Sequence, residues 1–275
     1  MHARAMVISP RRRLSQNFLI NQSVAQRIAE SIGVEAGGIV VELGAGTGAL
    51  TQHLINLPAS CVVAIELDSR AVSYLRSQLG TVPTLRVVEA DVRSIRIDNL
   101  ELPKDVPIYV VGNIPYHLTG PILFWLYEQA DRLRRVVLMV QKEVAARIVA
   151  QPGSKTYGIL SVATALITSD ARILFDVPPS AFCPRPQVIS SVVGIECMGL
   201  SLADTKRSQV MALVKAAFNQ RRKKLRNALS RYFQETGLKC CENATIASLL
   251  DRRAEELSPI QFCELAEIIH HRKDI

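Results

Sequence analysis

The sequence contains no apolar run long enough to cross a membrane. A spanning helix needs about 20 consecutive apolar residues, and polar or charged residues interrupt every apolar segment before that length. The opening MHARAMVISPRRRLSQ is basic and has no apolar signal-peptide core. We therefore expect a cytoplasmic protein with a basic N-terminal arm and no membrane partner. A short transit peptide is a minor alternative.

The cysteines are few and lack the spacing of a metal or disulfide framework. There are six, and no two form a CxxC pair. They are Cys61, Cys183, Cys197, Cys240, Cys241 and Cys263. Scattered cysteines of this kind are typical of reduced thiols in a reducing compartment, so we predict no metal site.

Acidic residues are missing from a long C-terminal segment. The net charge is +8, and residues 205–275 contain 14 Lys and Arg against 8 Asp and Glu. No acid occurs from residue 205 to residue 234. Basic charge concentrated in one segment favours a polyanionic partner, nucleic acid before membrane, although a solvated basic face is the plain alternative.

Apolar residues make up 48% of the 275 residues, enough for one large domain and a small one. Short β-branched runs alternate with helical patterns in the first part of the chain. The predicted strands are 39–43, 61–67, 85–91, 108–113 and 135–141, and the predicted helices are 22–33, 49–57, 69–79, 121–129 and 142–150. This alternation predicts an α/β fold with a mostly parallel sheet covered on both faces.

The pattern changes after residue 170. Residues 171–177 and 188–197 have no long helix between them, so we expect them to pair antiparallel at one edge of the sheet. Apolar spacing over 210–229 then predicts one helix, and Gly237 is its expected stop. Ser258-Pro259-Ile260-Gln261 forms a capping box that opens a last helix. We therefore predict a catalytic domain over 1–204 and a small helical domain over 205–275.

A glycine-rich loop follows the first strand of the predicted sheet. Gly44, Gly46 and Gly48 allow a sharp turn and close approach of a ligand, but no Lys-Ser/Thr pair follows as in a phosphate-binding P-loop. Glu66 ends the next strand, where a carboxylate can accept hydrogen bonds from two ribose hydroxyls. Asp91 ends the third strand, where it can accept a hydrogen bond from an adenine amino group. Ligands bind at such strand ends, so the pattern indicates an adenosine-bearing cofactor, either NAD or S-adenosylmethionine.

The segment after the fourth strand favours S-adenosylmethionine. The Asn113 side-chain oxygen and the Ile114 carbonyl are two acceptors for one planar amine, and we expect Pro115 to fix the backbone so that this carbonyl points outward. Tyr116 offers a flat face on which a base can stack. A dehydrogenase would instead need an acid or base beside a carbonyl, and His117 is a weak candidate for that role.

Several motifs together resemble a known family. ELGAGTGALT, AIELD, EADV and GNIPY, in this order, resemble the class I S-adenosylmethionine-dependent methyltransferases. More narrowly, the chain is similar to the KsgA (RsmA) family of small-subunit rRNA adenine N6,N6-dimethyltransferases. Four further motifs support that resemblance: RRRLSQNFLIN (11–21), SKTYGILSV (154–162), FCPRPQVISSV (182–192) and FNQRRKKLRNAL (218–229).

The resemblance implies a seven-stranded Rossmann-like methyltransferase sheet followed by an all-helical domain. It assigns cofactor contacts to residues in five motifs. These are Asn17, Leu19, Gly44, Gly46, Glu66, Leu67, Asp91, Val92 and Asn113. The same resemblance implies that the target adenine lies against Asn113, Ile114 and Pro115, between the rings of Tyr116 and Phe182.

Basic residues at two places are candidates for RNA contact. The first group is Arg11, Arg12 and Arg13 in the N-terminal arm. The second group is Arg221, Arg222, Lys223, Lys224 and Arg226. Because the predicted helix 210–229 contains no acid, we expect its charges to be uncompensated within the helix and to contact phosphates.

The family resemblance implies dimethylation of N6 on two adjacent adenosines near the 3′ end of 16S rRNA, in the 30S subunit or its precursor. We expect a monomer. Two other hypotheses remain open. In the first, the chain is an Erm-type enzyme that dimethylates 23S rRNA. In the second, it is mainly a ribosome-assembly factor in which methylation is secondary. A mitochondrial relative that acts in transcription is a weaker alternative.

Overall fold

The computed structural model describes residues 17–168, 170–197, 204–237 and 244–270. These residues form two compact units, each of which is described by itself. The first unit contains residues 17–145 and 170–197, and the second contains the remaining described residues. The predicted boundary after residue 204 separates most of the two, but it assigned 146–168 to the first domain, whereas these residues pack with the C-terminal helices.

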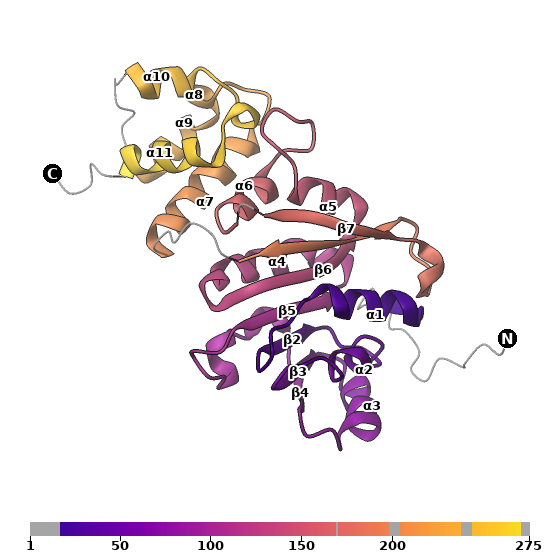
Figure 1. The fold of residues 1–275 in the computed structure, drawn as a ribbon. Coiled ribbons are helices and arrows are strands. Elements are labelled where there is room, and N and C mark those ends of the chain that lie inside the picture. The colour runs from indigo at the N-terminus through magenta and orange to yellow at the C-terminus, as the bar shows by residue number, and fades with distance from the viewer. Residues whose placement is uncertain (1–16, 169, 198–203, 238–243, 271–275) are drawn as a thin grey trace. The chain divides into compact units, whose positions relative to one another are not determined.

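The first unit is built on a seven-stranded sheet, as predicted (Figure 1). Its strands, in spatial order, are β4 (Leu85–Glu89), β3 (Cys61–Glu66), β2 (Ile39–Leu43), β5 (Ile108–Asn113), β6 (Leu133–Gln141), β9 (Ser190–Glu196) and β7 (Ala171–Val177). The strands from β4 to β6 pair in parallel, and β9 pairs antiparallel with both β6 and β7. The predicted antiparallel pair at one edge is therefore confirmed.

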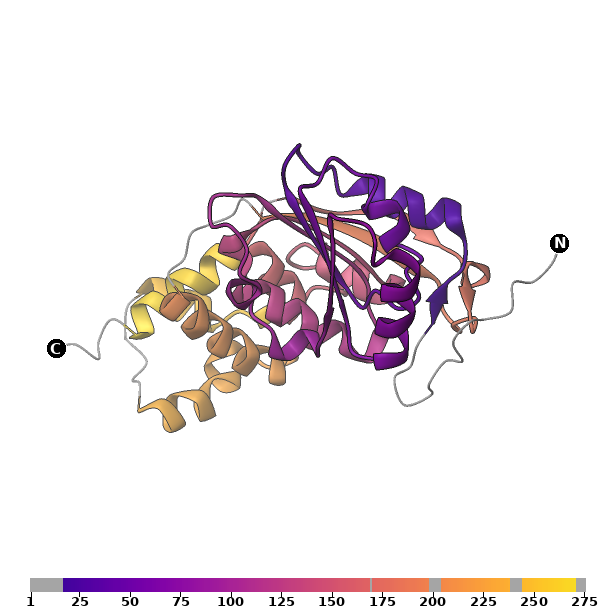
Figure 2. The ribbon, with the colours of Figure 1, turned by 90° about the horizontal axis from the view of Figure 1, so that it is seen from below.

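Helices cover both faces of this sheet, with α1, α2 and α3 on one face and α4 on the other (Figures 1 and 2). The helices of this part are α1 (Gln22–Ser31), α2 (Thr51–Leu54), α3 (Ser69–Leu79), α4 (Thr119–Glu128) and α5 (Lys142–Ile148), which ends in the second unit. Both β2 and β5 are buried almost throughout, as continuous apolar runs predict. Local capping begins two of the helices: the Asn21 side chain accepts from the amide of Val24, and the Asp68 side chain accepts from the amide of Arg70.

The chain order reverses between β2 and β5. From β2 the chain proceeds through β3 to the edge strand β4, and it then returns to the other side of β2 as β5. Leu43 pairs with Gly112, so the residues that follow these two strands begin side by side. Open α/β sheets bind ligands at such a reversal, outside the carboxyl ends of the strands.

A second, two-stranded sheet joins the first described residues to the segment before β9. It consists of β1 (Phe18–Leu19) and β8 (Phe182–Cys183), paired antiparallel. The amide of Ile20 also donates to the carbonyl of Ala181, at 2.8 Å. This pairing joins two motifs that are more than 150 residues apart in the sequence.

The second unit is helical. Its elements are α6 (Ile159–Ala165), α7 (Asp204–Asn219), α8 (Leu225–Ala228), α9 (Ser230–Thr236), α10 (Ala244–Leu250), a 3-10 turn η7 (Ala254–Glu256) and α11 (Pro259–His270). Ser258 and Gln261 exchange the two hydrogen bonds of the predicted capping box. Gly237 ends α9 with a left-handed backbone, as expected of a glycine stop. No helix in the described part of the chain is long and apolar enough to span a membrane.

The single helix predicted over 210–229 is wrong. Helix α7 ends at Asn219, and α8 begins only at Leu225. Lys224, which precedes α8, has an extended backbone, and its partner in an isolated β-bridge is Arg253. The basic cluster therefore lies mainly on the turn between two helices instead of along one helix face.

Candidate functional site

The glycine loop after β2 turns beside the end of β3. Gly44 and Gly46 both have left-handed backbones, with φ of 71° and 56°. A side chain at Gly46 would place its Cβ 3.2 Å from the Phe18 ring. The amide of Gly46 donates to Glu66 Oε2 at 2.8 Å. The loop thus needs glycine both for its backbone angles and for the space beside Phe18.

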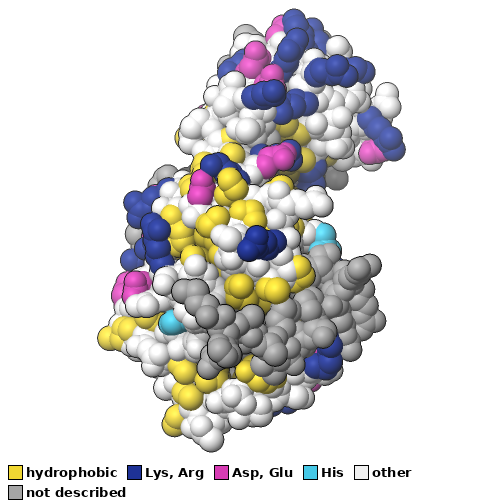
Figure 3. All heavy atoms as spheres, turned by 90° about the vertical axis from the view of Figure 1, so that its right-hand side faces the viewer, with side chains coloured by type: hydrophobic (Ala, Val, Ile, Leu, Met, Phe, Trp, Pro, Cys, Tyr) yellow, Lys and Arg dark blue, Asp and Glu magenta, His cyan; other side chains and the backbone are white. Residues whose placement is uncertain are grey.

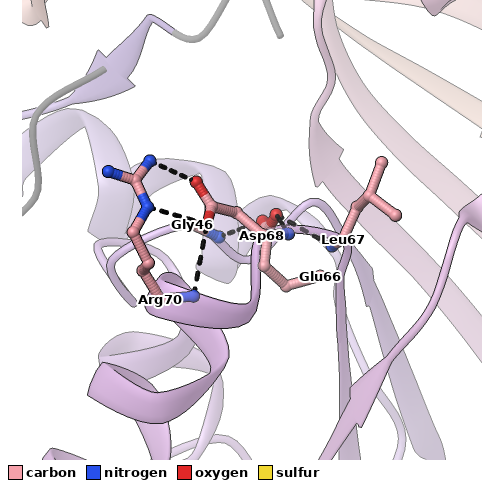
Figure 4. Close-up of polar contacts among 5 residues, drawn as sticks. All are labelled: Gly46, Glu66, Leu67, Asp68 and Arg70. Atoms are coloured by element: carbon pink, nitrogen blue, oxygen red, sulfur yellow. Dashed lines mark hydrogen bonds and ion pairs between the residues drawn. The ribbon is translucent and has the colours of Figure 1, made fainter. Parts of the chain in front are cut away.

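Glu66 is fixed by backbone amides, as Figure 4 shows. Its Oε1 accepts from the amides of Leu67 and Asp68, both at 2.8 Å, and its Oε2 accepts from Gly46. The residue is 7% exposed. A carboxylate has about four acceptor positions, so three amide bonds orient the group and leave acceptor capacity for a ligand.

Asp91 lies after β4 and begins the 3-10 turn η2 (Val92–Ser94). Its Oδ1 accepts from the amide of Arg93 at 2.9 Å, and its Oδ2 lies 2.6 Å from the Arg93 guanidinium. The hydrogen bonds from Arg93 hold the pKa of the Asp91 carboxyl below its usual range. Asp91 is therefore an anion at neutral pH.

Asn113 ends β5 directly beside the glycine loop. Its Nδ2 donates to the carbonyl oxygen of Asn17 at 3.2 Å. Because the nitrogen is used in this way, the side-chain oxygen is the atom left to accept a hydrogen bond from another group. A partner that lies 96 positions away in the sequence thus sets the orientation of the predicted acceptor.

The residues after Asn113 form the border of the same site. Ile114 is 2% exposed, and Pro115 has φ −56° and ψ 133°. Tyr116 begins a 3-10 turn, η4 (Tyr116–Leu118), and its Oη lies 2.7 Å from Ser190 Oγ. Burial raises the pKa of the Tyr116 phenol, with the hydrogen bond to Ser190 opposing the shift. The phenol therefore stays protonated at neutral pH.

A buried acid lies in the strand just before the glycine loop. Glu42 is 1% exposed, and its Oε2 accepts from the Thr51 hydroxyl at 2.6 Å. Burial raises the pKa of the Glu42 carboxyl to about 7, the Thr51 hydrogen bonds lower it and the charge of Glu66 raises it further. Sequence reasoning did not single out Glu42, although a lone Glu in the apolar run IVVEL was a usable sign.

The carboxyl ends of β2, β3, β4 and β5 and the loops that follow them line one pocket in the first unit. Its lining includes eleven residues that the sequence predicted: Asn17, Gly44, Gly46, Glu66, Leu67, Asp91, Val92, Asn113, Ile114, Pro115 and Tyr116. It also includes His117 and six residues that were missed: Phe18, Ile65, Ala90, Arg93, Leu118 and Ile122. Most of the missed residues are next to a predicted one in the sequence, which was the available sign.

Leu19 and Phe182 do not line this pocket. They face each other across the β1–β8 pair, and they are 4% and 2% exposed. Both belong to the apolar core that α1 and α2 form with the sheet. The expectation that Phe182 offers an open ring face opposite Tyr116 is therefore wrong for this structure, because its ring is packed in that apolar core.

The basic residues between Arg221 and Arg226 differ in the partners that they bind. Arg221 pairs with Glu255 at 2.5 Å and donates to the carbonyls of Ser154 and Lys155. Lys224 and Arg226 share a single acid, Asp251, at 3.2 Å and 2.7 Å. Their charges are therefore partly compensated by an acid 27 and 25 positions away, outside the predicted helix 210–229.

Arg222 and Lys223 are exposed between these ion-paired residues. Figure 3 shows Lys and Arg side chains gathered over the C-terminal helical unit, with a few acids among them. Arg11, Arg12 and Arg13 lie outside the described residues. Tyr157, of the SKTYG motif, is a core residue of the second unit: its hydroxyl donates to the carbonyl of Leu257 at 2.9 Å.

The chain matches a family model described as "Ribosomal RNA adenine dimethylase" over residues 8–271. It is 41% identical to the "Ribosomal RNA small subunit methyltransferase A" of Salinibacter ruber over 276 residues, which covers 96% of this chain and 86% of the relative. The protein of the same name from Magnetococcus marinus is 39% identical over 260 residues, with coverage of 94% and 91%.

Two solved structures resemble the fold. A dimethyladenosine transferase from Plasmodium falciparum has a TM-score of 0.73 at 23% identity, covering 94% of this chain and 98% of its own. The 23S rRNA methyltransferase ErmE has a TM-score of 0.65 at 23% identity, covering 92% and 99%. At this identity the likeness shows a shared fold and does not choose between their substrates.

The reversal between β2 and β5, the glycine loop, the acid at the end of β3 and the acid after β4 define a class I methyltransferase fold. This fold implies S-adenosylmethionine as the methyl donor. By the family match over nearly its whole length, the chain belongs to the ribosomal RNA adenine dimethylase family. It is accordingly an rRNA methyltransferase, as the sequence predicted.

Proposed function

We propose that this chain dimethylates N6 of two adjacent adenosines near the 3′ end of 16S rRNA, within the 30S subunit or its precursor. The main support is the Asn113 amide, which lies at the reversal between β2 and β5 with its nitrogen bonded to Asn17 and its oxygen free to accept. The relatives' names, which specify the small subunit, favour 16S rRNA over 23S rRNA as the substrate.

The residues of the pocket fit S-adenosylmethionine. Glu66 retains acceptor capacity for ribose hydroxyls, and Asp91 is an anion that can accept from the adenine amine. Leu67 and Val92 border the pocket near these acids with apolar side chains. The glycine loop, which has no side chains at Gly44 and Gly46, leaves room for the methionine part. The cofactor supplies an activated methyl group.

The chain's own residues orient the target amine. The adenine amine is a poor nucleophile because its lone pair is delocalised into the ring. Asn113 Oδ1 and the Ile114 carbonyl accept its two hydrogens and so favour a pyramidal nitrogen whose lone pair points at the methyl group. Pro115 restricts the backbone that follows this carbonyl. The catalytic contribution is therefore mainly alignment of the two reactants.

Tyr116 acts as a surface for the base and not as a proton acceptor. A phenol with a raised pKa, already bonded to Ser190, is protonated at the pH of the reaction. A strong base is not required, because the amine nitrogen becomes acidic once it has gained the methyl group. Its proton can pass to solvent through the open side of the site.

The RNA contacts are also part of the proposal. Arg222 and Lys223, which are exposed on the turn before α8, bind phosphates, and Lys224 and Arg226 add charge beside them. Arg11, Arg12 and Arg13 of the N-terminal arm contribute further phosphate contacts. Such contacts position the RNA but do not select the base. We propose that the enzyme acts as a cytoplasmic monomer in small-subunit biogenesis.

Primer extension across both rRNAs from a strain lacking this gene tests the substrate. The proposal expects the dimethyladenosine stops to disappear from 16S rRNA alone. Loss of a stop in 23S rRNA alone would establish the Erm-type alternative. Complementation with Asn113→Ala tests the assembly-factor alternative, provided that the variant still binds S-adenosylmethionine. Full recovery of ribosome maturation without methylation would show that binding is the primary role.

A further inference from the structure

We propose that Ser190 is a positioning residue for the target base and that it acts through Tyr116. This inference rests on the proposed function, in which the Tyr116 ring supports the adenine. The two oxygens, Tyr116 Oη and Ser190 Oγ, lie 2.7 Å apart although the residues are 74 positions apart in the sequence. Ser190 belongs to the FCPRPQVISSV motif but does not line the pocket.

The backbone of Ser190 is fixed from both sides. It lies at the start of β9, where it pairs with Gln141 of β6 and with Val177 of β7. The preceding carbonyl, of Ile189, accepts from the amide of Lys142 at 3.0 Å. The Ser190 residue is completely buried. Its hydroxyl is therefore a rigid anchor, because a short side chain on a doubly paired strand has little freedom to move.

The backbone around Tyr116 is held by fewer hydrogen bonds than that of Ser190. It begins a one-turn 3-10 helix of three residues, and the amide of Leu118 closes that turn on the carbonyl of Pro115 at 2.9 Å. The ring borders the pocket and is only half-buried. Such a turn does not by itself fix a ring that can rotate about two side-chain torsions. The bond to Ser190 fixes the far end of the ring.

Removal of the Ser190 hydroxyl should change the orientation of the Tyr116 ring. In Ser190→Ala, the Tyr116 phenol keeps its position only with an unpaired hydroxyl in a buried environment, which is unfavourable. The ring then turns toward solvent and no longer presents the same face to the site. In Tyr116→Phe the ring has no hydroxyl to leave unpaired. The double variant therefore recovers part of the activity that Ser190→Ala loses.

The next residue provides a matched control. Ser191 is also fully buried in β9, but adjacent strand residues point to opposite faces of the sheet. Its hydroxyl donates to Asp176 Oδ1 at 2.7 Å, and Lys142 binds the other oxygen of that carboxylate. Ser191→Ala thus removes a buried serine hydroxyl from the same strand without touching Tyr116.

The kinetic test uses the full chain and small subunits that lack the modification. We expect Ser190→Ala to lower kcat/KM for the subunit about fivefold to tenfold, the loss typical of one uncharged hydrogen bond, with an unchanged Kd for S-adenosylmethionine. Ser190→Thr, which keeps the hydroxyl, should restore most of the loss, and Ser191→Ala should have kcat/KM within about twofold of wild type. An unchanged kcat/KM in Ser190→Ala, or a double variant whose loss is the product of the two single losses, overturns the proposal.

A second measurement does not depend on the substrate. In the NMR spectrum of ¹³C-tyrosine-labelled protein, the Tyr116 signal is assigned by its loss in Tyr116→Phe. The chemical shift of this signal should change in Ser190→Ala and stay the same in Ser191→Ala. A Tyr116 signal that does not move in Ser190→Ala contradicts the anchoring itself. An inactive wild-type enzyme would instead contradict the proposed function, so the two failures are distinguishable.

Discussion

Replacement of Glu42 by glutamine should stabilise the first unit in a pH-dependent way. Burial raises the pKa of the Glu42 carboxyl to about 7 from an ordinary 4.5. Between these two values the folded protein holds a proton that the unfolded chain releases. The stabilising contribution of the protonated acid is therefore complete below about 4.5 and is lost as the pH rises through about 7. The total change is roughly 3 kcal/mol.

Glutamine keeps an oxygen that can accept from Thr51 and never ionises. Relative to wild type, Glu42→Gln should raise the free energy of unfolding by roughly 3 kcal/mol at pH 8 and by less than about 1 kcal/mol at pH 5. Any pH-independent cost of burying the amide cancels when the two pH values are compared. The measured quantity is therefore the increase in the free energy of unfolding at pH 8 minus the increase at pH 5.

Denaturant unfolding at pH 5 and pH 8 provides the assay. The chain has one tryptophan, Trp125, which is buried in α4, so its fluorescence reports the first unit. Glu89→Gln is the matched control, because Glu89 is an exposed glutamate at the end of β4. The same gain for Glu42→Gln at both pH values, or a larger gain at pH 5, would refute the reasoning.

Three further predictions concern the loop and the basic turn. Gly46→Ala should weaken S-adenosylmethionine binding at least about tenfold by calorimetry, because a left-handed φ costs a residue with Cβ about 1–2 kcal/mol and that Cβ meets the Phe18 ring. The double variant Arg222→Ala/Lys223→Ala should reduce the slope of log K against log salt for RNA binding by about 1.5 without changing stability. Arg221→Ala should leave that slope unchanged but destabilise the second unit by about 1–3 kcal/mol in denaturant unfolding, since Arg221 binds protein groups. An Arg221→Ala variant with a reduced slope and unchanged stability would show instead that Arg221 binds RNA.

The fold could be predicted from the sequence where the pattern is local. Runs such as IVVEL and CVVAIEL are continuous and β-branched, and each ends at a glycine loop or an acid, so they predicted β2, β3 and the side of the sheet where the site lies. The capping residues Ser258 and Gln261 predicted the start of α11 for the same reason, since both bonds form within four residues. The domain boundary was less accurate, because the membership of 146–168 in the second unit depends on distant partners such as Leu257.

The errors arise where partners distant in sequence decide the structure. Apolar spacing continued from α7 into α8, but the pairing of Arg221 with Glu255 and the bridge between Lys224 and Arg253 stabilise a turn between them. Phe182 was expected at an open surface, but it pairs with Leu19 of β1 and its ring is buried in the same apolar core. No local pattern contains these contacts, since each joins segments about 30 or more residues apart.

The proposed function requires that the enzyme transfers methyl groups to two adjacent adenosines of 16S rRNA and that Asn113 aligns the amine. The most direct test is transfer of tritiated methyl groups from S-adenosylmethionine to purified small subunits that lack the modification, followed by nucleoside analysis. We expect labelled N6,N6-dimethyladenosine with the wild-type chain and none with an Asn113→Ala variant that still binds the cofactor. No labelled N6,N6-dimethyladenosine with the wild-type chain, or undiminished transfer by the Asn113 variant, would contradict the proposed function.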